Sequence, residues 1–217
     1  MTREKMTVHR ALAELKTMDV RIDSAIRSTT YVLAVKRSAE KINGVKIDTF
    51  KDAMKANNQK VNDLIRRRNA MKRAVVLSNA TTKVTVGGKE YTVAEAIECK
   101  THGMEYMKAL KNSMTSAYLA AQAEMKRNDD EVLEKRAEQY VLSVIAAQPK
   151  DAKMSVDSEA MKTLRKSYIE NNAFEMLDPL GVAERIAELD EMIHAFEADV
   201  DAALSCSNAL TVIEFEY

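Results

Sequence analysis

Glycine and proline are scarce in this chain, with five glycines and two prolines among its 217 residues. These residue types supply the turns and breaks that short structural elements need. Apolar residues also recur at three- and four-residue spacing over long stretches, which is the pattern of one face of an α-helix. We therefore predict a mainly α protein that is built from a few long helices.

The two ends of the chain carry the most regular helical patterns. A helix is predicted over residues 8–27, where apolar residues at heptad positions form a stripe that suits packing against other helices. The last helix is predicted to begin with Asp178 as its N-cap and Pro179 as its first helical residue. Its heptad positions are apolar throughout: Val182, Ile186, Leu189, Ile193, Phe196, Val200 and Ala203.

Four further helices are expected between these two. One begins at Asp48, a good N-cap, and a long one follows residue 92 and breaks at residues 128–130. Another covers residues 130–147 and is ended by Pro149, and the shortest covers residues 158–171. Residues 148–157 form the best linker candidate.

Two of the remaining segments have the pattern of internal strands. Residues 28–35 are rich in β-branched and aromatic residues, and residues 36–46 form a loop with an Asn43-Gly44 turn. Alternating residues on both sides of Gly87-Gly88 predict a two-residue hairpin over residues 83–92. Thr92 and Glu95 then have the spacing of a capping box for the next helix.

The last residues of the chain change from a helical period to a period of two. This change predicts a terminal strand over residues 210–217. One face of that strand carries Thr211, Ile213, Phe215 and Tyr217.

These elements predict an antiparallel bundle or coiled coil of long helices. The hairpin, the strand at residues 30–35 and the terminal strand would meet at one end of the bundle as a small antiparallel β-sheet. Residues 1–111 and 172–217 would form the bundle and sheet. Residues 112–171 would be an inserted helical subdomain.

The net charge of zero hides a strong asymmetry along the chain. Residues 1–111 carry 23 Lys and Arg against 12 Asp and Glu, a net charge of +11, and the remainder carries −11. Either the basic half folds against the acidic half or against a neighbouring copy, or it forms a surface for nucleic acid. We favour the first explanation because the compensation is complete and exposed aromatics for base stacking are not evident.

A cluster of basic residues in the second helix raises the same two alternatives, pairing with acidic residues or binding of nucleic acid. Three consecutive residues span most of a helical turn, so they cannot all face one phosphate backbone. We predict pairing with the acidic last helix, and contact with phosphate or nucleic acid is the less favoured alternative. The candidate basic surface consists of Arg66, Arg67, Arg68, Lys72 and Arg73.

We find no catalytic, cofactor or metal-binding motif. His9, His102 and His194 are far apart in sequence, and the i,i+3 pair of His194 and Glu197 lacks the second copy that di-iron bundles carry. Two reduced thiols are favoured over a disulfide for the two cysteines. No run of about 18 apolar residues predicts a transmembrane helix. We expect no cofactor, no metal and no membrane partner.

The order of these elements resembles the septicolysin-like family of small bacterial and phage coiled-coil proteins. The resemblance lies in the N-terminal helix (Arg10-Ala-Leu-Ala-Glu-Leu), in the centre (Leu64-Ile-Arg-Arg-Arg-Asn and Tyr91-Thr-Val-Ala-Glu-Ala-Ile) and in the C-terminus (Leu177-Asp-Pro-Leu and Glu197-Ala-Asp-Val-Asp-Ala-Ala-Leu). Residues 112–171 do not match, and phage-encoded relatives of this longer type are the nearest likeness. The family has no established function, so the resemblance implies no catalytic residues.

We therefore expect a non-enzymatic structural or interaction protein that self-associates as a homo-oligomer. It would be a phage virion component or assembly factor, with other phage proteins as further partners. It would be made in the bacterial cytoplasm and, as a virion part, be incorporated into the particle. The alternative is a binding module that captures a host protein or a nucleic acid. The candidate self-association residues are Thr211, Ile213, Phe215 and Tyr217.

Overall fold

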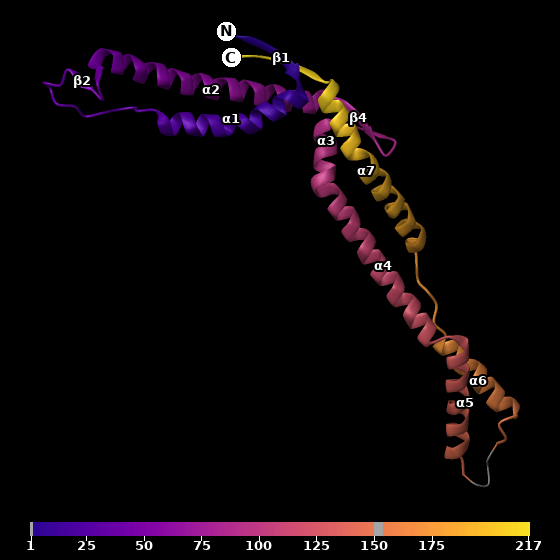
Figure 1. Cartoon of the computed structure of the whole chain (residues 1–217). Coiled ribbons are helices and arrows are strands. Elements are labelled where there is room, and N and C mark those ends of the chain that lie inside the picture. The colour runs from indigo at the N-terminus through magenta and orange to yellow at the C-terminus, as the bar shows by residue number, and fades with distance from the viewer. Residues whose placement is uncertain (1, 150–153) are drawn as a thin grey trace. The chain divides into compact units, whose positions relative to one another are not determined.

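The computed structural model describes residues 2–149 and 154–217, and it confirms a mainly α fold with small antiparallel sheets (Figure 1). The helices are α1 (Val8–Ser28), α2 (Ile47–Thr81), α3 (Val93–Glu98), the π-helical turn η1 (Cys99–Gly103), α4 (Met104–Arg127), α5 (Asp130–Ala147), α6 (Glu159–Asn172) and α7 (Val182–Leu210). The strands are β1 (Arg3–Thr7), β2 (Lys41–Ile42), β3 (Val45–Lys46), β4 (Lys83–Val86), β5 (Lys89–Thr92) and β6 (Val212–Glu216).

The chain divides into two compact units. The first consists of Met1–Met104 and His194–Tyr217, and the second of Glu105–Ile193. The insertion predicted over residues 112–171 lies inside the second unit. The helix α7 contributes residues to both units, so the first unit is discontinuous in sequence.

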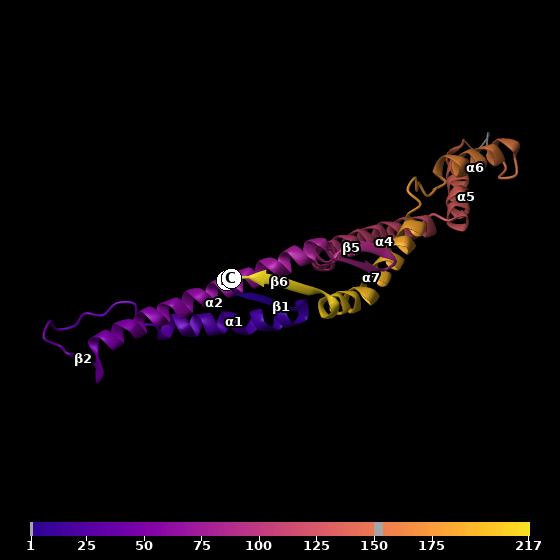
Figure 2. The ribbon, with the colours of Figure 1, turned by 90° about the horizontal axis from the view of Figure 1, so that it is seen from above.

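The core of the first unit forms where α1 and α2 lie side by side (Figures 1 and 2). The helix α1 starts at Thr7, whose hydroxyl accepts a hydrogen bond from the backbone N–H of Arg10. The three- and four-residue spacing along α1 places a stripe of buried side chains against α2 and β6. The buried cluster contains Met6, Val8, Ala11, Leu15, Met18, Met71, Val75, Ile213 and Phe215.

The two ends of the chain pair with each other. The strand β1 pairs antiparallel with β6, with Met6 opposite Ile213 and Glu4 opposite Phe215. This corrects the predicted sheet, because the terminal strand pairs with β1 and not with the hairpin, and each of the three sheets in the described part of the chain has two strands. The sequence of β1 gave no strand signal, since strand formation depends on an available partner more than on intrinsic preference.

The hairpin at residues 83–92 is confirmed. Gly87 and Gly88 have φ angles of 54° and 76°, values that L-residues adopt only with strain. Gly87 has a second reason to be glycine, since a Cβ there would lie 3.2 Å from the backbone of Ala195 and Phe196. The capping box of Thr92 and Glu95 is also present, so strand, turn and helix start are locally coupled.

The predicted strand at residues 28–35 is wrong. Residue 28 ends α1, and residues 29–36 are extended without any strand partner in the described chain. The predicted loop at residues 36–46 instead contains the short β2–β3 hairpin, whose turn uses Asn43 and Gly44 at positive φ. Both departures have one cause, since a strand requires a neighbouring edge and not a propensity alone.

The starts of two helices also differ from the prediction. The helix α2 begins at Ile47, and Asp48 lies in its first turn instead of at the N-cap. The carboxylate of Asp178 accepts hydrogen bonds from the N–H groups of Leu180 and Val182, but α7 begins only at Val182. Gly181 has a φ of 60°, outside the helical range, and therefore delays the start.

The second unit contains the antiparallel pair α5 and α6. The predicted break at residues 128–130 is confirmed, and Asp129 caps α5 by accepting a hydrogen bond from Val132 N–H. The rings of Tyr140 and Tyr168 stack between the two helices with centroids 4.9 Å apart. The buried side chains of this pair are Leu133, Ala137, Val141 and Met161.

Candidate functional site

The most densely bonded polar site surrounds Arg67 in the first unit. Its Nε and Nη2 atoms donate to the two carboxylate oxygens of Glu4 at 2.8 and 2.7 Å, a bidentate pair. The same Nη2 donates to Glu14 at 2.7 Å, and Tyr217 Oη donates to Glu4 at 2.7 Å. The side chain of Arg67 is only 20% exposed, so these bonds are partly shielded from water. We call these four residues the Arg67 cluster.

The Arg67 cluster shifts the acidity of its members. The hydrogen bonds from Arg67 lower the pKa of Glu4 to about 2, against partial burial that acts in the opposite direction. The hydrogen bond to Glu4 and partial burial raise the pKa of Tyr217. The guanidinium also lies 5.9 Å from the centre of the Tyr217 ring. This arrangement stabilises the contact between the chain ends.

The predicted pairing of the basic cluster with the acidic last helix is wrong for the two arginines that make long-range pairs. Arg67 pairs with Glu4 and Glu14, and Arg68 pairs with Asp19 at 3.1 Å. These acids belong to β1 and α1, which pack against this stretch of α2. The sequence contains these acidic residues, but it does not predict that β1 and α1 pack beside Arg67 and Arg68.

The other members of the basic cluster stay on the surface. Arg66, Lys72 and Arg73 are exposed, and Arg66 forms a long ion pair of 3.8 Å with Asp63, three residues before it on the same helix. The cluster is thus divided between side chains used inside the fold and side chains turned to solvent. Only the second group is available to a partner.

The acidic last helix pairs instead with two lysines of the predicted third helix and with the turn of the β4–β5 hairpin. In the first unit, Lys100 pairs with Asp201, and Asp199 accepts a hydrogen bond from Gly87 N–H at 3.2 Å. In the second unit, Lys111 pairs with Asp190 at 2.6 Å. Each unit therefore has its own bond between α7 and residues 87–111.

The predicted self-association residues lie mostly inside their own chain. Ile213 and Phe215 belong to the core cluster, and Tyr217 belongs to the Arg67 cluster. The face of β6 that carries them is covered by β1, α1 and α2 of the same chain. Little of this face is therefore exposed for contact with a second copy.

The helix α4 has a stripe that its own unit covers only in part. Among the residues of α4, Met104 is the one that is fully buried, and it belongs to the first unit. The remaining stripe residues are half-buried, although they occupy heptad positions. We call this stripe the α4 seam: Met107, Met114, Tyr118, Ala121 and Met125.

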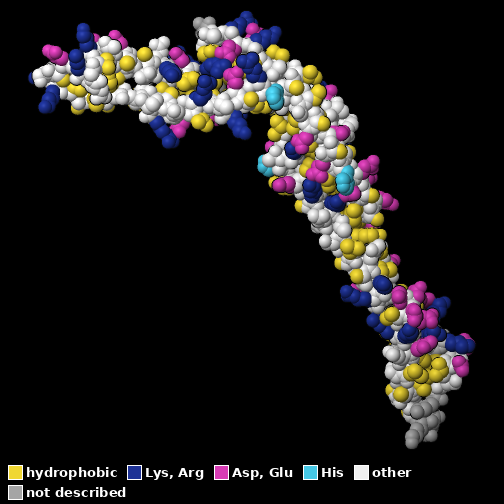
Figure 3. All heavy atoms as spheres, viewed as in Figure 1, with side chains coloured by type: hydrophobic (Ala, Val, Ile, Leu, Met, Phe, Trp, Pro, Cys, Tyr) yellow, Lys and Arg dark blue, Asp and Glu magenta, His cyan; other side chains and the backbone are white. Residues whose placement is uncertain are grey.

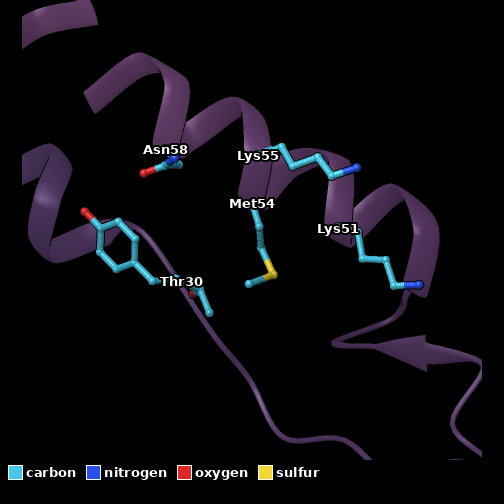
Figure 4. A pocket seen from close by; sticks show the side chains of 6 residues that line it. Thr30, Lys51, Met54, Lys55 and Asn58 are labelled. Carbon is cyan, nitrogen blue, oxygen red and sulfur yellow. The ribbon is translucent and has the colours of Figure 1, made fainter. Parts of the chain in front are cut away.

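An extended apolar segment lies beside the first turns of α2. Residues 30–35 run past a hollow of about 390 Å³ that Thr30, Tyr31, Met54 and Asn58 help to line. The side chain of Met54 points from α2 toward this segment (Figure 4). Lys and Arg side chains stand out at this end of the unit, where β2 lies (Figure 3). A hydrophobic strip on a basic background is a feature that could take a partner.

The described residues include few groupings of side chains that could act as nucleophiles, acids, bases or metal ligands. His102 lies 3.1 Å from Glu98 on the same helix, and burial raises the pKa of Cys99. Within residues 2–149 and 154–217, no group of three or more His, Cys, Asp or Glu could hold a metal ion. No helix of the described chain has the length and apolar character needed to cross a membrane.

Comparisons with protein-family models, with curated proteins and with solved structures found no match to this chain. The resemblance to the septicolysin-like family therefore stays a prediction.

Proposed function

We propose that this protein acts by self-association, as a structural or interaction protein that does not catalyse a reaction. The α4 seam carries the proposal. Its five residues are neither fully buried nor freely exposed, and burial of apolar surface contributes roughly 25 cal/mol per Å², so covering the area that remains exposed would add stability. A second copy carries the same stripe, and knobs-into-holes packing of the two stripes would bury the apolar surface that remains exposed.

The sequence resemblance supports a more specific role, namely a phage-encoded virion component or assembly factor with other phage proteins as partners. The alternative is a binding module that captures a host protein or a nucleic acid. The exposed side chains of Arg66, Lys72 and Arg73 support that alternative. Fractionation of infected-cell lysate separates the two roles, because a virion component stays with the particles and a capture module stays free.

Light scattering on the purified chain tests self-association directly. At micromolar concentration and physiological salt we expect a stable oligomer, and a monomer would refute the proposal. Met114→Glu places a charge in the α4 seam and should weaken the oligomer. Ser113→Glu is the matched control, because Ser113 is the exposed neighbour outside the seam.

A further inference from the structure

One exposed segment of the first unit has the properties of a strand without a partner. Its large side chains face solvent, and Val32 is 85% exposed. No backbone group of residues 30–35 makes a backbone hydrogen bond to the described part of the chain. Unpaired extended backbone of this kind is a template for strand addition. The exposed apolar side chains are Tyr31, Val32, Leu33 and Val35.

The surroundings of this segment are basic. Residues 27–60 contain eight Lys and Arg against three Asp and Glu. Three of the basic residues form local pairs, Arg27 with Asp23, Lys51 with Asp48 and Lys55 with Asp52. The others make no ion pair with any residue in the described ranges. These are Lys36, Arg37, Lys41, Lys46 and Lys60.

A second exposed segment has the opposite charge. Residues 173–181 connect α6 to α7, contain Glu175 and Asp178, and contain no Lys or Arg. Leu177 is 88% exposed, and residues 174–177 make no backbone hydrogen bond within the described chain. Asp178 is occupied in local turns, whereas Glu175 has no ion-pair partner among the described residues. The exposed apolar side chains are Phe174, Met176, Leu177 and Leu180.

We infer that residues 30–35 of one copy dock against residues 174–177 of a second copy. Both segments are extended, unpaired and apolar, so their backbones can exchange hydrogen bonds while their side chains bury each other. Their charges are complementary, whereas pairing either segment with itself would bring like charges together. A contact between two different surfaces is heterologous, so it propagates into a ring or an open filament.

This inference rests on the proposed self-association and identifies one contact through which copies of the chain would associate. It is independent of the α4 seam, because the two surfaces share no residue. The two segments therefore add a direction to the assembly, because each copy would contact its two neighbours through two different surfaces.

Mixing of two full-length variants tests the contact. Val32→Asn damages the first surface and Leu177→Asn damages the second, and both side chains are too exposed for the fold to depend on them. Each variant alone should associate about tenfold more weakly than the parent chain, equivalent to ~1.4 kcal/mol. Each variant keeps the surface that the other has lost, so an equimolar mixture should form a heterodimer. Val20→Asn, at a site that is 71% exposed on α1, is the control and should assemble like the parent.

Sedimentation of the parent, the variants and the mixture gives distinct outcomes. A monomeric parent overturns both the proposed function and this contact. An oligomeric parent whose two variants assemble normally overturns this contact alone and leaves self-association standing. Loss of assembly in Val32→Asn alone would mean that the first segment pairs with itself or with another partner. Loss in both variants without heterodimers in the mixture would also refute the head-to-tail contact.

Discussion

Tyr217 donates a hydrogen bond of 2.7 Å to Glu4, although the two residues are 213 positions apart. The bond lies at the end of the β1–β6 ladder, where the N–H of Thr2 also donates to the carbonyl of Tyr217 at 3.1 Å. The first and last described residues are thus held together by backbone pairing and by a charged cluster on one face. The first unit is therefore complete only when both of its chain segments, which lie far apart in sequence, are present.

Removal of the Tyr217 hydroxyl tests the contribution of that bond. Tyr217→Phe should lower the free energy of unfolding by about 1–2 kcal/mol, because hydrogen bonds to charged groups exceed neutral ones. Urea denaturation followed by circular dichroism measures the change. Tyr106→Phe is the control, since Tyr106 is 76% exposed, and it should change stability by less than about 0.5 kcal/mol.

The lowered pKa of Glu4 predicts that the free energy of unfolding falls at acidic pH. The folded pKa of about 2 lies below the ordinary glutamate pKa of 4.5, so the stabilisation is complete above about pH 4.5. It is lost as the pH falls from there toward 2, because the unfolded chain binds a proton that the folded chain resists. Glu4→Gln should be less stable at neutral pH and should lose less stability over this range. Melting temperatures between pH 2 and pH 7 would contradict the prediction if the two curves ran parallel.

Arg67 and Arg66 are neighbours in sequence with different environments, and they form a matched pair. Arg67→Met leaves Glu4 without its bidentate partner, whereas Glu14 keeps Arg10, and the change should cost about 2 kcal/mol. Arg66→Met should cost less than about 0.5 kcal/mol, because that side chain is exposed. Equal effects in chemical denaturation would show that the cluster contributes little.

The two glycines of the β4–β5 turn form another matched pair. Gly87→Ala should cost about 2–3 kcal/mol, because the added Cβ meets the backbone of α7 at 3.2 Å and the φ angle is positive. Gly88→Ala should cost about 1 kcal/mol, since its φ is also positive but no atom lies within 4 Å of the new Cβ. Thermal unfolding that ranked the two variants in the opposite order would show that the close approach is unimportant.

Local chemistry determined the features that could be predicted from the sequence. The Gly87-Gly88 turn, the Thr92 capping box and the break before α5 each depend on residues within a few positions of one another. The long helices follow from apolar spacing, because a stripe on one helical face has to be buried.

Only the tertiary structure decided which distant segments meet. The pairing of β1 with β6 joins opposite ends of the chain, and the β1 sequence has no strand preference that would announce it. That pairing brings Glu4 to Arg67, fills the apolar face of β6 from within the chain, and leaves residues 30–35 without an edge to join. The physical reason is that strand pairing and ion pairing are long-range, so residue type indicates what a segment can do and the fold selects its partner.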